Sequence, residues 1–179
     1  MHLTQRLAAA TVLGLALVGS VYPVAHAGGP HHAARTAPLP RCRTVGLKVT
    51  LGPGSGTAGS TFVPIRLKNV SGHTCRTGGY GGVAFVGFGN GTQIGHPAVR
   101  VHPNRVRSLV VRPGRRVTAR LREVDALNFP RATCRPAKTD GLRVIPPNNT
   151  AAAFVAQKAF GCKDRRVHLL FLSPYHQGP

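Results

Sequence analysis

Four cysteines constrain the fold of this sequence more than any other feature: Cys42, Cys75, Cys134 and Cys162. All of them follow an N-terminal segment with the features of a secretory signal, so they are expected to reach an oxidising compartment and to pair. Four cysteines allow three pairings. We favour Cys42 with Cys75 and Cys134 with Cys162, because each bond would close a loop of about 30 residues and stabilise the fold by roughly 3–4 kcal/mol.

The N-terminal segment, residues 1–27, has the order of parts that is typical of a signal peptide. Arg6 precedes an apolar run, and the small-x-small cleavage pattern Ala25-His26-Ala27 ends the segment. The run is shorter than the roughly 20 residues that cross a bilayer, so no transmembrane segment is expected. No cysteine stands close behind it, so no lipid anchor is expected. We therefore expect a secreted, extracellular protein that could associate with the cell wall.

Beyond the signal, the pattern of residues changes once. Residues 28–41 combine Gly and Pro with no apolar period and are expected to form a flexible leader. Residues 42–179 are expected to form a single domain of short β-branched or aromatic stretches that turn residues separate. The expected strands lie at 44–51, 61–69, 83–88, 98–102, 106–111, 116–124, 142–145, 152–157 and 167–173. No stretch shows a sustained helical period, so we predict an all-β fold, an antiparallel β-sandwich with two disulfides.

Residues 105–124 have the strongest signal for a hairpin. Pro113 and Gly114 supply the fixed φ and the positive φ that a type II turn requires. After the turn, apolar residues at 117, 119 and 121 alternate with polar or basic residues at 118, 120 and 122. One face of this arm is therefore expected to be buried and the other exposed.

The charge is strongly one-sided, with 24 Lys and Arg against 4 Asp and Glu and a formal net charge of +20. The densest basic cluster consists of Arg100, Arg105, Arg107, Arg112, Arg115, Arg116, Arg120 and Arg122. If Arg105 and Arg107 share the outward face of the hairpin with Arg120 and Arg122, they form a stripe that can grip phosphates or carboxylates. The alternative is a solvated basic face that keeps the domain soluble.

The expected ligands of this stripe are anionic cell-wall polymers, acidic polysaccharide or anionic lipid headgroups, which fit an exported protein. Nucleic acid is not expected, because it is an unusual partner outside the cell and no aromatic residues are interleaved with the arginines.

Catalysis is not expected, because the acids that it would use are scarce. Glu123 and Asp125 are the only close pair, and their expected role on one strand face is ion pairing with the neighbouring arginines. No serine stands in a G-x-S-x-G elbow, and paired cysteines supply no nucleophile. We predict a non-enzymatic binding domain, with a cell-wall hydrolase that uses these two acids or a protein-recognition module as the alternatives.

Two motifs resemble ligand sites but lack the context for them. GSGTAG at 54–59 matches a dinucleotide fingerprint, yet β-prone residues follow it where a helix should begin, so an inter-strand loop is expected. In NVSGHTCRTGGYGG at 69–82, His73 and Cys75 would be a metal pair without two further ligands. We expect this stretch to be a corner of the folded chain, with no metal and no cofactor.

Several segments together resemble a known family. They are the Asn-x-Ser-Gly-x-x-Cys turn that runs into Gly79-Tyr80, the Pro113-Gly114 hairpin, and Cys134 and Cys162 on either side of LRVIPPNNT. The chain from about 42 to 173 resembles the domain of unknown function family 4232 of secreted and surface-anchored bacterial proteins. This resemblance implies an immunoglobulin-like β-sandwich with two disulfides and no established activity.

Overall fold

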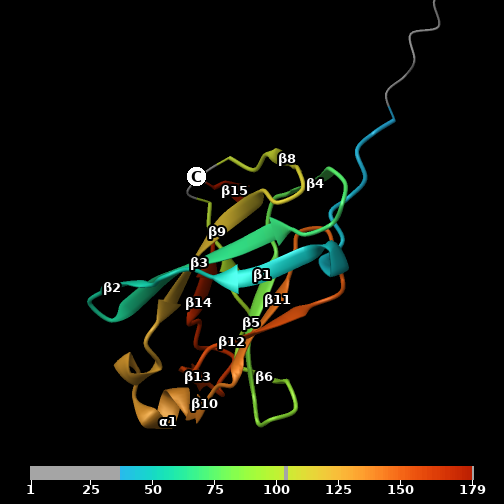
Figure 1. Ribbon diagram of the computed structural model, residues 1–179. Coiled ribbons are helices and arrows are strands. Elements are labelled where there is room, and N and C mark those ends of the chain that lie inside the picture. Colours follow the sequence, from blue (N-terminus) through green and yellow to red (C-terminus); the bar gives the residue numbers. More distant parts are fainter. Residues whose placement is uncertain (1–36, 103–104, 179) are drawn as a thin grey trace, which may run out of the picture. The chain divides into compact units, whose positions relative to one another are not determined.

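Strands dominate the computed structural model, which describes residues 37–102 and 105–178 (Figure 1). Within these residues the content is 49% strand and 7% helix, against the 20–25% strand of an ordinary globular protein. The predicted all-β class is confirmed at this level. The helical elements are a 3₁₀ turn η1 (Thr44–Gly46), a second 3₁₀ turn η2 (Ala126–Asn128) and the short helix α1 (Arg131–Cys134).

The largest sheet has seven strands. Its central order is β1 (Leu47–Leu51), β3 (Ser60–Asn69), β9 (Arg116–Val124), β14 (Leu170–Leu172) and β7 (Val99–Arg100). In addition, β2 (Ser55–Thr57) pairs with β3, and β15 (His176–Gln177) pairs with β9. All of these pairs are antiparallel except β14 with β7.

A four-stranded sheet and two strand pairs complete the fold. The order in the four-stranded sheet is β12 (Ala153–Ala156), β11 (Gly141–Ile145), β5 (Gly82–Gly87) and β6 (Thr92–Ile94). The two pairs are β4 (Cys75–Gly78) with β8 (Ser108–Val111), and β10 (Pro136–Lys138) with β13 (Phe160–Cys162). All of these contacts are antiparallel.

The core forms where the inward faces of the two larger sheets meet. In β3 and β9 the buried residues alternate with exposed or half-buried ones, as residues on opposite faces of a strand should. The seven-stranded sheet contributes Ile65, Leu67, Val117, Ala119 and Leu121 to a single apolar cluster. The four-stranded sheet contributes Val83, Phe85, Leu142 and Val144 to the same cluster. Burial of these side chains therefore holds the two sheets together.

Both predicted disulfides are present. Cys42 is bonded to Cys75 and Cys134 to Cys162, and the Cα atoms of the two pairs are 4.9 and 4.6 Å apart. The first bond attaches the chain just before η1 to the start of β4, and the second joins the end of α1 to β13. The pairing that the loop lengths favoured is confirmed.

The predicted hairpin around Pro113 and Gly114 is correct in its turn and wrong in its pairing. The Arg115 amide donates to the Arg112 carbonyl at 3.0 Å, and Gly114 has φ +75°, as a type II turn requires. However, β8 pairs with β4, and β9 pairs with β3. The reason lies at Asn69, whose backbone carbonyl accepts from the Gly114 amide and whose amide donates to the Arg115 carbonyl. The turn is thus hydrogen-bonded to the end of β3, so β9, which begins directly after the turn, pairs with β3.

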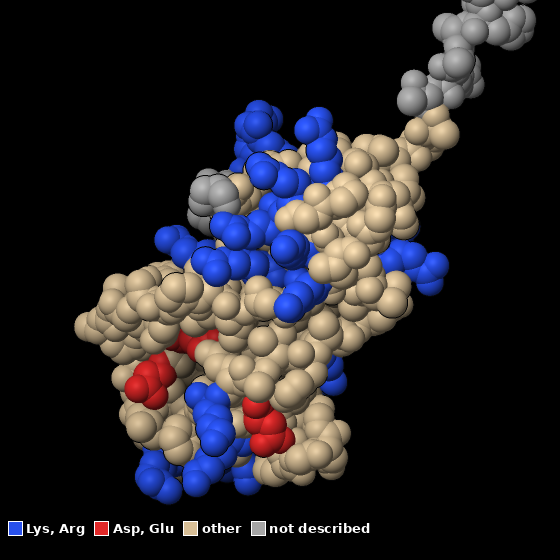
Figure 2. Space-filling model, viewed as in Figure 1, with Lys and Arg blue, Asp and Glu red and all other residues tan. Residues whose placement is uncertain are grey.

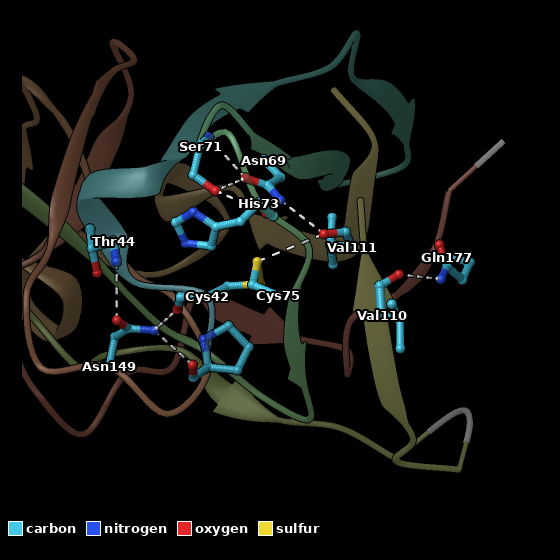
Figure 3. The surroundings of a disulfide bond; sticks show 11 residues. Cys42, Thr44, Asn69, Ser71, His73, Cys75, Val110, Val111, Asn149 and Gln177 are labelled. Atoms are coloured by element: carbon cyan, nitrogen blue, oxygen red, sulfur yellow. Dashed lines mark hydrogen bonds between the residues drawn. A yellow bond between two sulfur atoms is a disulfide. The ribbon is translucent and has the colours of Figure 1, made fainter. Parts of the chain in front are cut away.

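The stretch 69–82 is a corner, as predicted, and the Asn69 side chain organises it (Figure 3). Asn69 is fully buried, and its Nδ2 donates to the carbonyls of His73 and Val111 at 2.9 and 2.8 Å. Its Oδ1 accepts from the amide and the hydroxyl of Ser71 at 2.9 and 2.6 Å. One amide therefore ties the corner before β4 to the end of β8.

Asn69→Ala is expected to lower the free energy of unfolding by about 2 kcal/mol, because it removes the buried hydrogen bond to the Val111 carbonyl and the bonds that hold the corner at Ser71 and His73. Urea unfolding followed by circular dichroism measures the change. The control is Asn90→Ala, which removes a similar contact to the Thr92 amide from an exposed turn and should cost less than about 0.5 kcal/mol. Equal losses in the two variants would contradict the central role of Asn69.

Candidate functional site

The structure divides the eight arginines of the predicted cluster among four places. Arg116, Arg120 and Arg122 lie on the outward side of β9, and Arg112 and Arg115 flank the turn before it. Arg100 belongs to β7, while Arg105 and Arg107 lie in the segment that precedes β8.

The hairpin face that would join Arg105 and Arg107 to Arg120 and Arg122 is not formed. It required β8 and β9 to be paired arms of one hairpin, and β8 pairs with β4 instead. Arg105 and Arg107 therefore do not oppose β9 in any ladder.

A different basic surface takes the place of the stripe, and we call it the basic face. Its residues point outward from three neighbouring strands of the seven-stranded sheet. They are Lys48 of β1, Arg66 and Lys68 of β3, and Arg116, Arg120 and Arg122 of β9. Figure 2 shows Lys and Arg side chains gathered over these strands, with the acidic side chains visible apart from them.

The strand register brings the basic side chains close together. Lys68 is opposite Lys48 on one side and opposite Arg116 on the other. Directly opposed residues of an antiparallel pair have Cβ atoms only about 4.5–5.5 Å apart, and like charges at that distance destabilise a sheet. Sequence reasoning missed Lys48, Arg66 and Lys68, although the alternation within 61–69 places Arg66 and Lys68 on the outward side. The strand register therefore keeps like charges of the basic face close together.

Two of these arginines lie against aromatic rings. The Arg120 Cζ is 4.8 Å from the centroid of Phe62, and the Arg122 Cζ is 4.3 Å from the centroid of Phe171. A guanidinium over a ring is held by cation–π attraction, and the N–H groups around its edge can still donate to an anion. The rings thus restrict Arg120 and Arg122 before any ligand arrives.

The chain's own carboxylate side chains do not neutralise this surface. Asp125 accepts from the Leu127 amide at the start of η2, and Asp140 accepts from the Gly89 amide. Asp164 pairs with Arg166 and Arg135, and the Arg166 hydrogen bonds hold the pKa of that carboxyl well below its usual range. Within 37–102 and 105–178, ion pairs between side chains are confined to Asp164.

The remaining acid, Glu123, is buried, and its predicted ion pair with arginine is wrong. Glu123 follows the buried positions 117, 119 and 121 of β9 at the same spacing of two residues. This alternation in the sequence could have predicted that Glu123 is buried. Its Oε2 accepts from Nε2 of Gln157 at 2.8 Å. Burial raises the pKa of Glu123 to about 7, although the bond from Gln157 opposes the rise. Glu123 and Asp125 line one recess of about 460 Å³, but Asp125 is already engaged at η2.

The two motifs that resembled ligand sites are structural. Residues 54–59 include β2 and the turn into β3, so the expected loop is largely a hairpin, and no helix follows the glycines. Cys75 is bonded to Cys42, so its sulfur is not a free thiolate. Among the described residues, no three His, Cys, Asp or Glu side chains are grouped so that they could hold a metal ion. In the same part of the chain, no helix is long and apolar enough to cross a membrane.

Comparison with known proteins identifies a family and nothing narrower. Residues 42–174 match the model of the family described as Domain of unknown function (DUF4232). No curated protein and no solved structure matches the chain. The matched residues include both disulfides, the corner at Asn69 and every strand of the basic face. The chain therefore belongs to the family Domain of unknown function (DUF4232).

Proposed function

We propose that this protein is a secreted, non-enzymatic binding domain that holds anionic polymers of the cell envelope on its basic face. The observation that carries the proposal is the row of basic side chains on β1, β3 and β9. Within the described residues, no carboxylate side chain forms an ion pair with Lys48, Arg66, Lys68, Arg120 or Arg122 of this row. The two opposed sheets and two disulfides support an immunoglobulin-like antiparallel β-sandwich as the scaffold. The disulfides also support an oxidising, extracellular location.

The form of the basic face favours a polymer over a single ion. Outward positions recur about every 7 Å along a strand and about every 4.8 Å across strands, so the cationic groups form a two-dimensional array. An extended chain of phosphates or carboxylates can contact several of these groups at once and release its condensed counterions. Salt should therefore weaken the complex steeply.

The test compares two variants that lose the same number of positive charges. The face variant carries Lys48→Gln, Arg66→Gln, Arg120→Gln and Arg122→Gln. The control variant carries Lys138→Gln, Lys158→Gln, Lys163→Gln and Arg165→Gln, all exposed and outside the strands of the basic face. Retention on phosphocellulose and on immobilised polygalacturonate is measured against a sodium chloride gradient.

The face variant is expected to elute at clearly lower salt than the control variant. The slope of log affinity against log salt should fall by up to about 3, since each lost phosphate contact reduces it by roughly 0.7–0.9. Equal shifts of the two variants would mean that net charge alone governs retention, and the proposed face would be rejected.

The two alternatives give other outcomes. A protein-recognition module would co-purify with one protein partner at high salt, with no difference between the face and control variants. A cell-wall hydrolase would release soluble fragments from envelope material, and Glu123→Gln would stop the release, because Glu123 has the raised pKa that a general acid needs.

A further inference from the structure

A second basic site lies in a hollow of about 700 Å³ beside β4, separate from the basic face. Four arginines contribute to its wall: Arg41, Arg76, Arg100 and Arg107. All four side chains are exposed, so a ligand from solvent can reach them. Ligand sites in proteins have volumes of about 300–1,000 Å³, so the hollow is large enough for a small molecule.

The disulfide between Cys42 and Cys75 sets two of these arginines side by side. Arg41 precedes one cysteine and Arg76 follows the other, and the two residues form a parallel β-bridge. The Cys42 amide donates to the Arg76 carbonyl at 2.9 Å, and the Arg76 amide donates to the Pro40 carbonyl at 2.8 Å. A covalent bond and two hydrogen bonds thus fix the backbones of two adjacent cations.

Hydrogen bonds to the 146–150 turn also hold Arg41 in place. Nη1 of Arg41 donates to the Asn148 carbonyl at 2.8 Å. The next residue, Asn149, donates to the carbonyls of Cys42 and Pro147 and accepts from the Thr44 amide (Figure 3). The 146–150 turn is therefore attached to the segment that carries Arg41, and the position of the Arg41 guanidinium is restricted.

Arg107 joins the hollow because the chain approaches it closely at Gly78. Gly78 is opposite Ser108 in the β4–β8 pair and has φ +139°, which side chains rarely allow. A Cβ at Gly78 would overlap the carbonyl oxygen of Arg107. Glycine at this position lets the segment before β8 lie against the end of β4, which brings Arg107 to the same hollow as Arg76.

Arg100 of β7 is the fourth arginine of the hollow. Its Cζ is 5.5 Å from the centroid of Tyr80, which also lines the hollow. The Tyr80 hydroxyl donates to the Val101 carbonyl at 2.9 Å and is 2.7 Å from Nδ1 of His102. The bond at its hydroxyl restricts the ring, and Arg100 lies over the ring.

We propose that this hollow binds a small molecule or chain end that carries two or more oxyanions, either phosphates or carboxylates. Four arginines from distant parts of the chain line one concave space, and none of the four forms an ion pair with a carboxylate side chain within the described residues. Cations that a disulfide holds together repel each other, and an anion with several oxygens relieves that repulsion while accepting their paired N–H donors. A flat array such as the basic face offers no such enclosure.

The experiment titrates the protein with pyrophosphate, citrate and inorganic phosphate by isothermal calorimetry at fixed ionic strength. The site variant is Arg76→Gln with Arg107→Gln, and the matched control is Arg120→Gln with Arg122→Gln, which removes the same charge from the basic face. Pyrophosphate represents a ligand with phosphates, and citrate represents a ligand with carboxylates. The anion that binds more tightly shows which class the hollow prefers.

The site variant should weaken binding of the preferred anion by at least about tenfold, since it removes two guanidinium groups that donate charge-assisted hydrogen bonds. The control variant should leave this binding within about twofold. Equal weakening in both variants, or no binding above that of inorganic phosphate, would overturn the proposal. Retention on phosphocellulose separates this result from the function proposed above, because it depends on the basic face and should respond mainly to Arg120 and Arg122.

Discussion

Replacing Cys42 and Cys75 together by alanine is expected to lower the free energy of unfolding by about 3–4 kcal/mol. The two cysteines are 33 residues apart, so the bond removes much of the conformational freedom of that loop from the unfolded chain. The bond also joins the start of the domain to β4, where the Cys42 amide meets the Arg76 carbonyl. Urea unfolding under non-reducing conditions measures the loss in the free energy of unfolding, with a lower midpoint.

The second disulfide provides a matched control. Cys134 and Cys162 are 28 residues apart, so their replacement by alanine should cost a similar amount. The two double variants should differ in anion binding, because only the first releases Arg41 from Arg76. Pyrophosphate or citrate affinity is therefore expected to fall in the first variant and to persist in the second. Unfolding midpoints equal to that of the wild type in both variants would show that neither bond stabilises the fold.

Local signals predicted the parts of the fold that depend on short stretches of chain. The alternation of apolar and polar residues placed a strand at 116–124, and the structure has it with the same bounds. Pro113 and Gly114 predicted the turn, because the φ angles that they favour are properties of those residues alone. Loop length favoured the correct disulfide pairing, since sequence separation is itself a property of the sequence.

Contacts between distant segments were harder to predict. The alternation of apolar and polar residues in β9 predicts which side chains share a face, but it does not predict which strand pairs with β9. Two backbone hydrogen bonds at Asn69 place β9 next to β3 and leave β8 to β4, and no residue within 105–124 encodes that choice. The basic face therefore includes Lys48 and Arg66, which sequence reasoning did not select, and excludes Arg105 and Arg107, which it did.

The hollow beside β4 also depends on contacts between distant segments. Arg41, Arg76 and Arg107 are far apart in the sequence, and a disulfide, a parallel bridge and the close approach at Gly78 bring them together. Once Cys42 is known to pair with Cys75, however, the arginines beside the two cysteines must be neighbours. In this family a basic residue next to each cysteine of the first disulfide is therefore a signal that can be sought in sequence.

Glu123→Gln is expected to stabilise the protein at pH 8 by about 3 kcal/mol and to change little at pH 5. Burial raises the pKa of Glu123 from 4.5 to about 7, so the folded protein holds this proton more tightly than the unfolded chain does. Stability from this group is complete below pH 4.5 and is lost as the pH rises through 7. A shift of about 2.5 units corresponds to about 3 kcal/mol at 1.36 kcal/mol per unit.

The side-chain arrangement explains why glutamine suits this site better than a carboxylate. Oε1 of Glu123 and Oε1 of Gln157 are both buried acceptors without a protein partner among the described residues, while Nε2 of Gln157 already donates to Oε2 of Glu123. An amide at position 123 supplies a donor for the Gln157 oxygen and removes the buried negative charge.

Unfolding free energies measured by urea between pH 5 and pH 8 test the effect of Glu123. The wild type should lose about 2.5 kcal/mol more than Glu123→Gln across this range, because only the wild type must ionise a buried carboxyl or keep it protonated at rising cost. Asp125→Asn is the control, since it removes the same charge from the same recess and retains a side chain that can accept from the Leu127 amide. Its pH profile should run parallel to that of the wild type. A Glu123→Gln profile with the same slope as the wild type would mean that Glu123 is ionised at little cost in the folded state.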